Sequence, residues 1–190
     1  MHTIEPYWNW RDFYSAENDK NSPFYRREYN EFAYVDKIYN YYIHPQWDFF
    51  GSETLYLKLL YANYKNGSAI IELIGEWNDC RANDIETLKH NFINKLIENG
   101  IYRFVLIGEN LLEFFSGGNE YYEEWHDEII ENGGWIIALN FREHVLDEMR
   151  DAQIHYFINI HEKYTVENWR QYKPFHLVQY LEDLLIKVIP

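Results

Sequence analysis

The sequence has only one cysteine, Cys80, in 190 residues. A single cysteine excludes an internal disulfide and a cysteine-based zinc cluster, and it is typical of a protein from a reducing compartment. Basic residues are also scarce: 17 Lys and Arg stand against 31 Asp and Glu, so the net charge is −14. A surface of this charge repels phosphate backbones and anionic lipid headgroups, which excludes nucleic acid and membranes as expected partners.

Long apolar runs and common cofactor motifs are missing as well. No stretch reaches the roughly 18 consecutive apolar residues of a membrane-spanning helix. The first residues lack the basic segment and apolar run of a secretory leader, so we expect a cytoplasmic protein. The glycine motifs of dinucleotide-binding, P-loop and α/β-hydrolase proteins do not occur. His161-Glu162 begins a zinc-protease-like pattern, but Thr165 replaces its second histidine, so we expect neither a metal nor a cofactor.

Aromatic residues, by contrast, are abundant and unevenly placed. They make up 19% of the chain, yet 16 of the first 50 residues are aromatic. This shift divides the chain into an aromatic-rich N-terminal extension, residues 1–53, packed on a main domain of residues 54–190. Tyr and Trp are enriched both in cores and at protein interfaces, so the extension either closes the core or presents a surface to a partner. A homodimer would reconcile the two interpretations.

Hydrophobic patterning predicts an alternation of strands and helices from residue 54 onward. Residues 54–61 and 69–75 have strand composition, and Asn66-Gly67 between them predicts an antiparallel hairpin with a type I′ turn. Asn83 and Glu86 form a capping-box pattern at the start of a helix that runs to Gly100. The later elements are strands at 102–107, 135–139 and 155–160, and helices at 119–131, 141–150 and from Pro174 onward.

These elements define the predicted fold class. Helices between successive strands imply parallel pairing by right-handed crossovers. We therefore expect an α/β domain with a mixed, mainly parallel sheet that opens with an antiparallel hairpin. Asn140 with Glu143 repeats the capping-box pattern before the helix at 141–150. Residues 34–43, which stop at His44-Pro45, predict one further strand at an edge.

The order of elements over residues 54–160 resembles the STAS domain, the fold of bacterial anti-sigma-factor antagonists. Ile74-Gly75-Glu76-Trp77-Asn78-Asp79 is similar to the Gly-Glu-Leu-Asp segment that leaves the second strand of that family. Residues 102–107 resemble its central strand, and residues 131–139 resemble a helix end, glycine pair and strand. The resemblance implies a non-enzymatic regulatory role in which the chain binds another protein.

The phosphorylation motif of the family is not retained. Its antagonists carry Asp-Ser-Ser-Gly at the start of the second helix, where this chain has Phe115-Ser116-Gly117-Gly118. Only Ser116 keeps a hydroxyl, and nearby Glu120 and Glu123 would repel a phosphate. We therefore expect no phospho-switch, although Ser116 stays among the candidate binding residues.

Polar side chains at the carboxyl ends of the predicted strands suggest a ligand site, because ligands of open α/β sheets bind there. The candidate binding residues are Glu76, Asn78, Asp79, Glu109, Asn110 and Ser116. If the carboxylates among them, together with Glu162, shared one rim, they would form an acidic crevice suited to cation binding or acid–base chemistry. In the alternative interpretation they only cap helices and complement helix dipoles.

The sequence therefore predicts a cytoplasmic, non-enzymatic protein-binding module of regulatory or scaffolding type. Its partner is another protein. The alternative is a small enzyme or ligand-binding protein that uses the acidic crevice.

Overall fold

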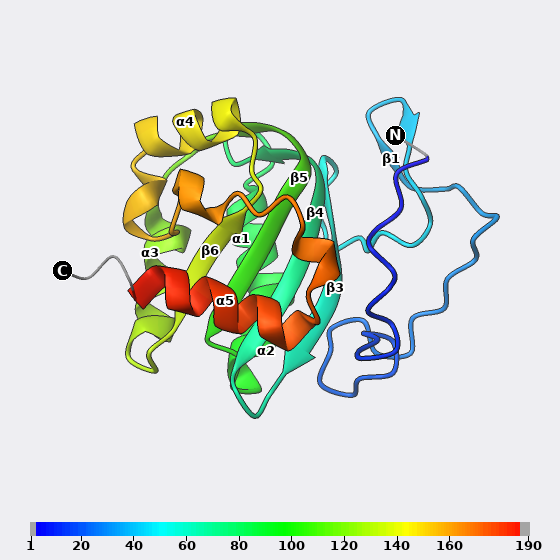
Figure 1. Ribbon diagram of the computed structural model, residues 1–190. Coiled ribbons are helices and arrows are strands. Elements are labelled where there is room, and N and C mark those ends of the chain that lie inside the picture. Colours follow the sequence, from blue (N-terminus) through cyan, green and yellow to red (C-terminus); the bar gives the residue numbers. More distant parts are fainter. Residues whose placement is uncertain (1–2, 187–190) are drawn as a thin grey trace.

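The computed structural model describes residues 3–186 and contains a four-stranded sheet of order β3-β4-β5-β6 (Figure 1). β3 (Leu55–Asn63) runs antiparallel to β4 (Ser68–Asn78), and β4, β5 (Arg103–Phe115) and β6 (Trp135–Leu139) are mutually parallel. The predicted fold class, a mixed and mainly parallel sheet that opens with a hairpin, is confirmed.

The β3–β4 hairpin forms as predicted, but its turn differs. Four residues, 64–67, connect Asn63 to its pairing partner Ser68, and only Gly67 has a positive φ, of 68°. The predicted two-residue type I′ turn is therefore wrong. The side chain of Asn63 explains the longer connection, because its Oδ1 accepts hydrogen bonds from the backbone N–H groups of Lys65 and Asn66.

The first predicted helix consists of α1 (Asp84–Leu88), the π-helical segment η1 (Lys89–Ile93) and α2 (Asn94–Glu98). Its predicted cap is wrong, since Asn83 adopts a left-handed conformation with φ 50° and no side-chain bond to the helix backbone. The carboxylate of Asp79 takes that role, because its Oδ1 accepts from the Ile85 N–H at 2.8 Å.

Two further helices follow the predicted positions: α3 (Glu120–Ile130) and α4 (Glu143–Asp151). The capping box predicted for α4 is wrong. Arg142 occupies the capping position, and Asn140 has φ 54°. The Asn140 side chain instead accepts a hydrogen bond from the Val166 N–H at 2.7 Å, which ties the end of β6 to a later loop.

Each face of the sheet carries its own hydrophobic core. The helices from α1 to α4 cover one face, where Leu88, Phe92 and Trp125 are fully buried. α5 (Pro174–Ile186) crosses the other face, as Figure 1 shows, and buries Leu177 and Leu181 against it. Pro174 opens this helix as predicted, a position where its missing N–H costs nothing.

Two strand predictions are wrong: one strand is longer than predicted, and another does not form. β5 continues to Phe115, so the predicted strand at 102–107 covers only its first half. Residues 155–160 do not form a strand; the 3₁₀-helical turn η2 (Ile154–Tyr156) and a single bridge between Ile137 and Asn159 stand there. Two further 3₁₀-helical turns, η3 (Glu162–Tyr164) and η4 (Trp169–Gln171), precede α5. Ile154 and Ile158 are buried while Tyr156 is 65% exposed, and this spacing of four is not the alternation of a strand.

Residues 34–43 form a separate small hairpin rather than the predicted single edge strand. β1 (Lys37–Ile38) pairs with β2 (Tyr41–Tyr42). The chain reverses at Tyr39, whose φ is 54°. In Figure 1 this hairpin and the preceding N-terminal residues lie beside the β3 edge of the sheet.

Hydrogen bonds from two indole rings tie the N-terminal residues to later segments of the chain. Trp10 is 3% exposed and donates from Nε1 to the Tyr172 carbonyl at 3.0 Å. Trp47 is fully buried and donates to the Ile4 carbonyl at 2.8 Å.

Among residues 3–186, no helix is long and apolar enough to cross a membrane.

Candidate functional site

The carboxyl ends of β4 and β5 project beyond the rest of the sheet and border two adjoining clefts. The pairing of β6 with β5 stops at Ile107 of β5, so among residues 3–186 the second half of β5 has no strand beside it except β4. The smaller cleft has a volume of about 450 Å³ and the larger about 680 Å³. They share three lining residues: Tyr39, Asn78 and Arg81.

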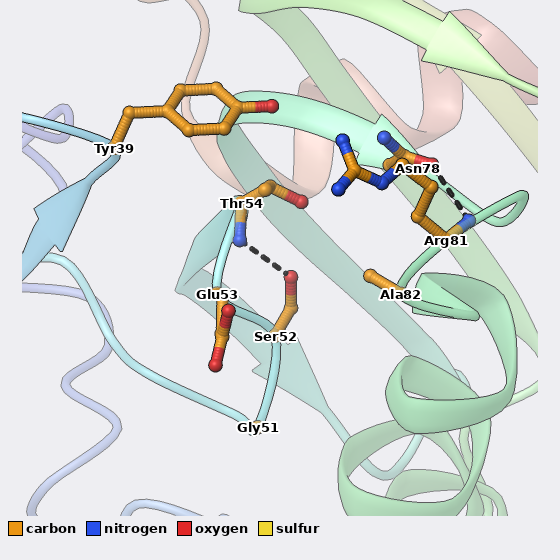
Figure 2. Close-up of a pocket in the computed structure, with 8 residues that line it drawn as sticks. All are labelled: Tyr39, Gly51, Ser52, Glu53, Thr54, Asn78, Arg81 and Ala82. Carbon is orange, nitrogen blue, oxygen red and sulfur yellow. Dashed lines mark hydrogen bonds between the residues drawn. The ribbon is translucent and has the colours of Figure 1, made fainter.

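The smaller cleft, drawn in Figure 2, is lined mainly by polar groups from three segments. Tyr39 comes from the β1–β2 turn, residues 51–54 precede β3, and residues 78–82 follow β4. The hydroxyls at the base of the cleft already have partners. Ser52 Oγ accepts from the backbone N–H of Thr54 at 3.1 Å, and Thr54 Oγ1 donates to Asp84 Oδ2 at 3.2 Å.

The larger cleft combines an apolar wall with three carboxylates. Phe114, Phe115 and Ala152 supply apolar surface, and the acidic side chains are Glu76, Glu148 and Asp151. Asn78, Cys80 and Ser116 complete the lining together with Tyr39 and Arg81.

One hydrogen bond connects the wall shared by the two clefts to the acidic lining. Glu76 Oε2 accepts from the Tyr39 hydroxyl at 2.6 Å. This bond raises the pKa of the Tyr39 hydroxyl, with small further increases from burial and the negative charge of Glu76, while the positive charge of Arg81 opposes them. The tyrosine that overhangs both clefts is thereby held in place.

Asp79 lies near the same strand end, but its carboxylate is hydrogen-bonded within the fold. It is 7% exposed, and its Oδ1 accepts from Trp77 Nε1 at 3.0 Å as well as from Ile85. Its Oδ2 accepts from the Tyr122 hydroxyl at 2.5 Å. Burial raises the pKa of Asp79 to about 6 despite these hydrogen bonds. The sequence predicts Asp79 as a binding residue. In the structure, its carboxylate oxygens accept hydrogen bonds from groups inside the core.

Glu109 lies on the face of the sheet that α5 covers. Its Oε2 accepts from Arg170 Nη2 at 2.5 Å, and its Oε1 accepts from Trp169 Nε1 at 2.7 Å and Asn140 Nδ2 at 2.9 Å. Burial acts to raise the pKa of Glu109, but these hydrogen bonds outweigh it and the pKa lies below its ordinary value. Neither Glu109 nor Asn110, which is inside β5, lines either cleft.

The predicted acidic crevice is therefore not formed as a single rim. Glu76, Asn78 and Ser116 meet in the larger cleft, whereas Asp79 is buried behind it and Glu109 faces away. Glu162, predicted at the end of a fifth strand, belongs to η3. Among residues 3–186, no group of three or more His, Cys, Asp or Glu side chains could hold a metal ion.

Sequence reasoning missed the two residues that most shape the clefts, Tyr39 and Arg81. Tyr39 was hidden in an aromatic stretch that predicted a strand. Arg81 did carry a signal, because it is the only basic residue between Glu76 and Glu86 in an otherwise acidic segment.

Comparison with known proteins gives a match by structure but none by sequence. No protein-family model matches the chain, and no curated protein matches it. Among solved structures, the chain is similar to an anti-sigma-factor antagonist, the class that the sequence motifs resemble. That protein is SpoIIAA in its unphosphorylated form, with 15% sequence identity and a TM-score of 0.45; the match covers 61% of this chain and 97% of SpoIIAA.

Proposed function

We propose that this chain is a non-enzymatic protein-binding module, of regulatory or scaffolding type, that works in the cytoplasm. Its binding region is the hairpin surface, which we define as the exposed apolar side chains of residues 32–49. These are Phe32, Tyr34, Val35, Tyr39, Tyr41, Tyr42 and Phe49.

The concentration of exposed apolar groups in this short segment is the observation that carries the proposal. Phe32 is 94% exposed, Val35 74% and Tyr41 62%. Burial of apolar surface stabilises a complex by roughly 25 cal/mol per Å² before the costs of association. Several exposed apolar groups within one short segment of a folded domain are typical of an interaction site, and tyrosine supplies contact area at a low entropic cost.

Charge indicates what kind of partner suits this surface. The net charge of −14 favours a protein with a basic surface around an apolar patch, because opposite charges speed encounter and fix orientation. A second copy of this chain would carry the same negative charge, so a homodimer has to offset that repulsion by apolar contact.

The experiment compares the proteins captured from native-cell extract by three forms of the chain. These are the wild type, the double variant Val35→Ser with Tyr41→Ser, and the control Tyr156→Ser, which replaces a 65% exposed aromatic residue on η2. A specific partner should be retained by wild type and control and lost by the hairpin variant. Titration calorimetry with the purified partner should then show affinity reduced about tenfold or more.

Sedimentation velocity on the same three proteins identifies self-association. Dimerisation that disappears only in the hairpin variant would make a second copy the partner. A partner that binds wild type and hairpin variant equally would overturn the proposal.

A further inference from the structure

We propose that the two adjoining clefts bind a small zwitterion with an apolar body, an apolar amino acid or dipeptide. The ligand carboxylate lies against Arg81 and Asn78, and its ammonium faces the carboxylates of the larger cleft. This proposal does not depend on the partner binding proposed above, although Tyr39 belongs both to the hairpin surface and to the wall shared by the clefts.

Two hydrogen-bond donors in the shared wall lack acceptors. The guanidinium of Arg81 makes no ion pair or hydrogen bond with any residue in the range 3–186, although the chain is strongly acidic. Asn78 is 7% exposed, and its Oδ1 accepts from the Arg81 backbone N–H at 3.0 Å. That bond orients the amide so that its Nδ2 donors face the cleft, beside the guanidinium in Figure 2, without a partner in the described chain.

The free donors call for an anion with a single charge. A guanidinium presents paired N–H groups that match a carboxylate in bidentate geometry. Glu53 lines the smaller cleft, and Glu76 and the buried Asp84 lie close by. These negative charges disfavour a phosphate dianion more than a carboxylate, because one guanidinium cannot balance two charges.

The rest of the ligand follows from the larger cleft. Its lining includes three carboxylates against the one guanidinium of Arg81, so an anion alone would be repelled there. Asp151 is exposed and makes no hydrogen bond or ion pair within the described residues, which leaves it available to an ammonium. Phe114 and Phe115 supply apolar surface in the same cleft. A carboxylate, an ammonium and an apolar body satisfy all of these groups together.

The volumes agree with a ligand of this size. Pockets for small molecules are typically about 300–1,000 Å³, mostly apolar, with a few polar groups that fix orientation. The clefts of about 450 and 680 Å³ lie within that range. A free amino acid would occupy the shared wall, and a dipeptide would extend farther into both clefts.

Isothermal calorimetry with matched probes tests the proposal. The probes are L-phenylalanine, L-leucine and the dipeptide Leu-Phe, together with phenylalaninamide, which lacks the carboxylate, and N-acetylphenylalanine, which lacks the ammonium. At least one zwitterion should bind, and both modified probes should bind about tenfold or more weakly. The probe that binds most tightly shows whether the ligand is a free amino acid or a dipeptide.

Variants assign each end of the ligand to its protein group. Arg81→Gln should lower phenylalanine affinity to that of phenylalaninamide and leave the affinity for phenylalaninamide unchanged. Asp151→Asn should lower phenylalanine affinity to that of N-acetylphenylalanine and leave the affinity for N-acetylphenylalanine unchanged. Arg11→Gln, with the same change of charge at an exposed arginine outside both clefts, should bind like the wild type.

Several outcomes would overturn the proposal. These are no binding of any zwitterion at millimolar concentration, equal binding of the modified probes, and unchanged affinity in Arg81→Gln. Circular dichroism of each variant should match the wild type, which is expected because all three replaced side chains are exposed.

Discussion

Replacement of Glu72 by glutamine is expected to remove a large part of the pH dependence of stability between about pH 5 and 8. Glu72 lies in β4 and is 1% exposed, and its Oε2 accepts a hydrogen bond from the backbone N–H of Tyr7 at 2.7 Å. Burial raises the pKa of Glu72 from 4.5 to about 7. The Tyr7 hydrogen bond and the positive charge of Arg170 oppose this increase only in part.

The sign of the effect follows from which state holds the proton. Between pH 4.5 and about 7, folded Glu72 keeps a proton that the unfolded chain has already released, so stability falls as the pH rises through this window. Each pKa unit corresponds to about 1.4 kcal/mol, so the loss approaches about 3 kcal/mol at pH 8. Glutamine cannot ionise, and its carbonyl can still accept from Tyr7.

Urea unfolding followed by tryptophan fluorescence measures the effect at several pH values in wild type and Glu72→Gln. Burial also raises the pKa of Asp79, to about 6, but Asp79 is present in both proteins and cancels in the difference. Relative to wild type, the variant should gain about 2.5 kcal/mol between about pH 5 and 8. Glu28→Gln, at an exposed glutamate, is the control. A difference between wild type and Glu72→Gln that does not vary with pH would refute the reasoning.

Substitutions at four other positions test the packing and the clefts. Phe92→Ala should lower the free energy of unfolding by about 3–5 kcal/mol in urea titrations, because Phe92 is fully buried. Gly75→Ala should cost at least about 2 kcal/mol by calorimetric unfolding, since φ is 115° and a Cβ would lie 2.1 Å from the Thr54 carbonyl oxygen. Lys89→Met should change stability by less than about 1.5 kcal/mol, whereas Lys89→Ala should cost about 2–5 kcal/mol, because the buried ammonium is paired while the alanine leaves a cavity. Ser116→Asp and Ser116→Ala should both retain the partner in pull-down assays, since Ser116 lies in the larger cleft and not on the hairpin surface; loss with the aspartate alone would reveal a phospho-switch.

Elements with strong local signals could be predicted from the sequence. β6 occupies the predicted residues 135–139, and α5 begins at Pro174 as expected. β5 was predicted too short because Gly108, Glu109 and Asn110 interrupt its apolar run. The strand continues through them because its register with β4 shifts between Ile107 and Asn110, and such a bulge has no local sequence signature.

The candidate site was harder to predict because its contacts are long-range. The sequence alone predicts that Glu109 is a free carboxylate at a strand end. In the structure, its partner is Arg170, which lies 61 residues later in the chain. The Asp79 carboxylate replaces the predicted Asn83 cap because β4 delivers it to the start of α1. In both cases the sequence identifies a carboxylate at a strand end, but the three-dimensional partner decides its role.

The clefts exist because the strands of the sheet differ in length. β6 has 5 residues, whereas β4 has 11 and β5 has 13, so within the described part of the chain the ends of β4 and β5 extend as a strand pair past β3 and β6. Backbone and side chains of such an extension need cover from elsewhere in the chain. Tyr39 of the small hairpin and the end of α4 supply it without closing over the ends, and this incomplete cover leaves Arg81 and Asn78 facing open space. A fifth strand at residues 155–160 would have extended the sheet beyond β6, far from this extension, so its absence does not open the clefts.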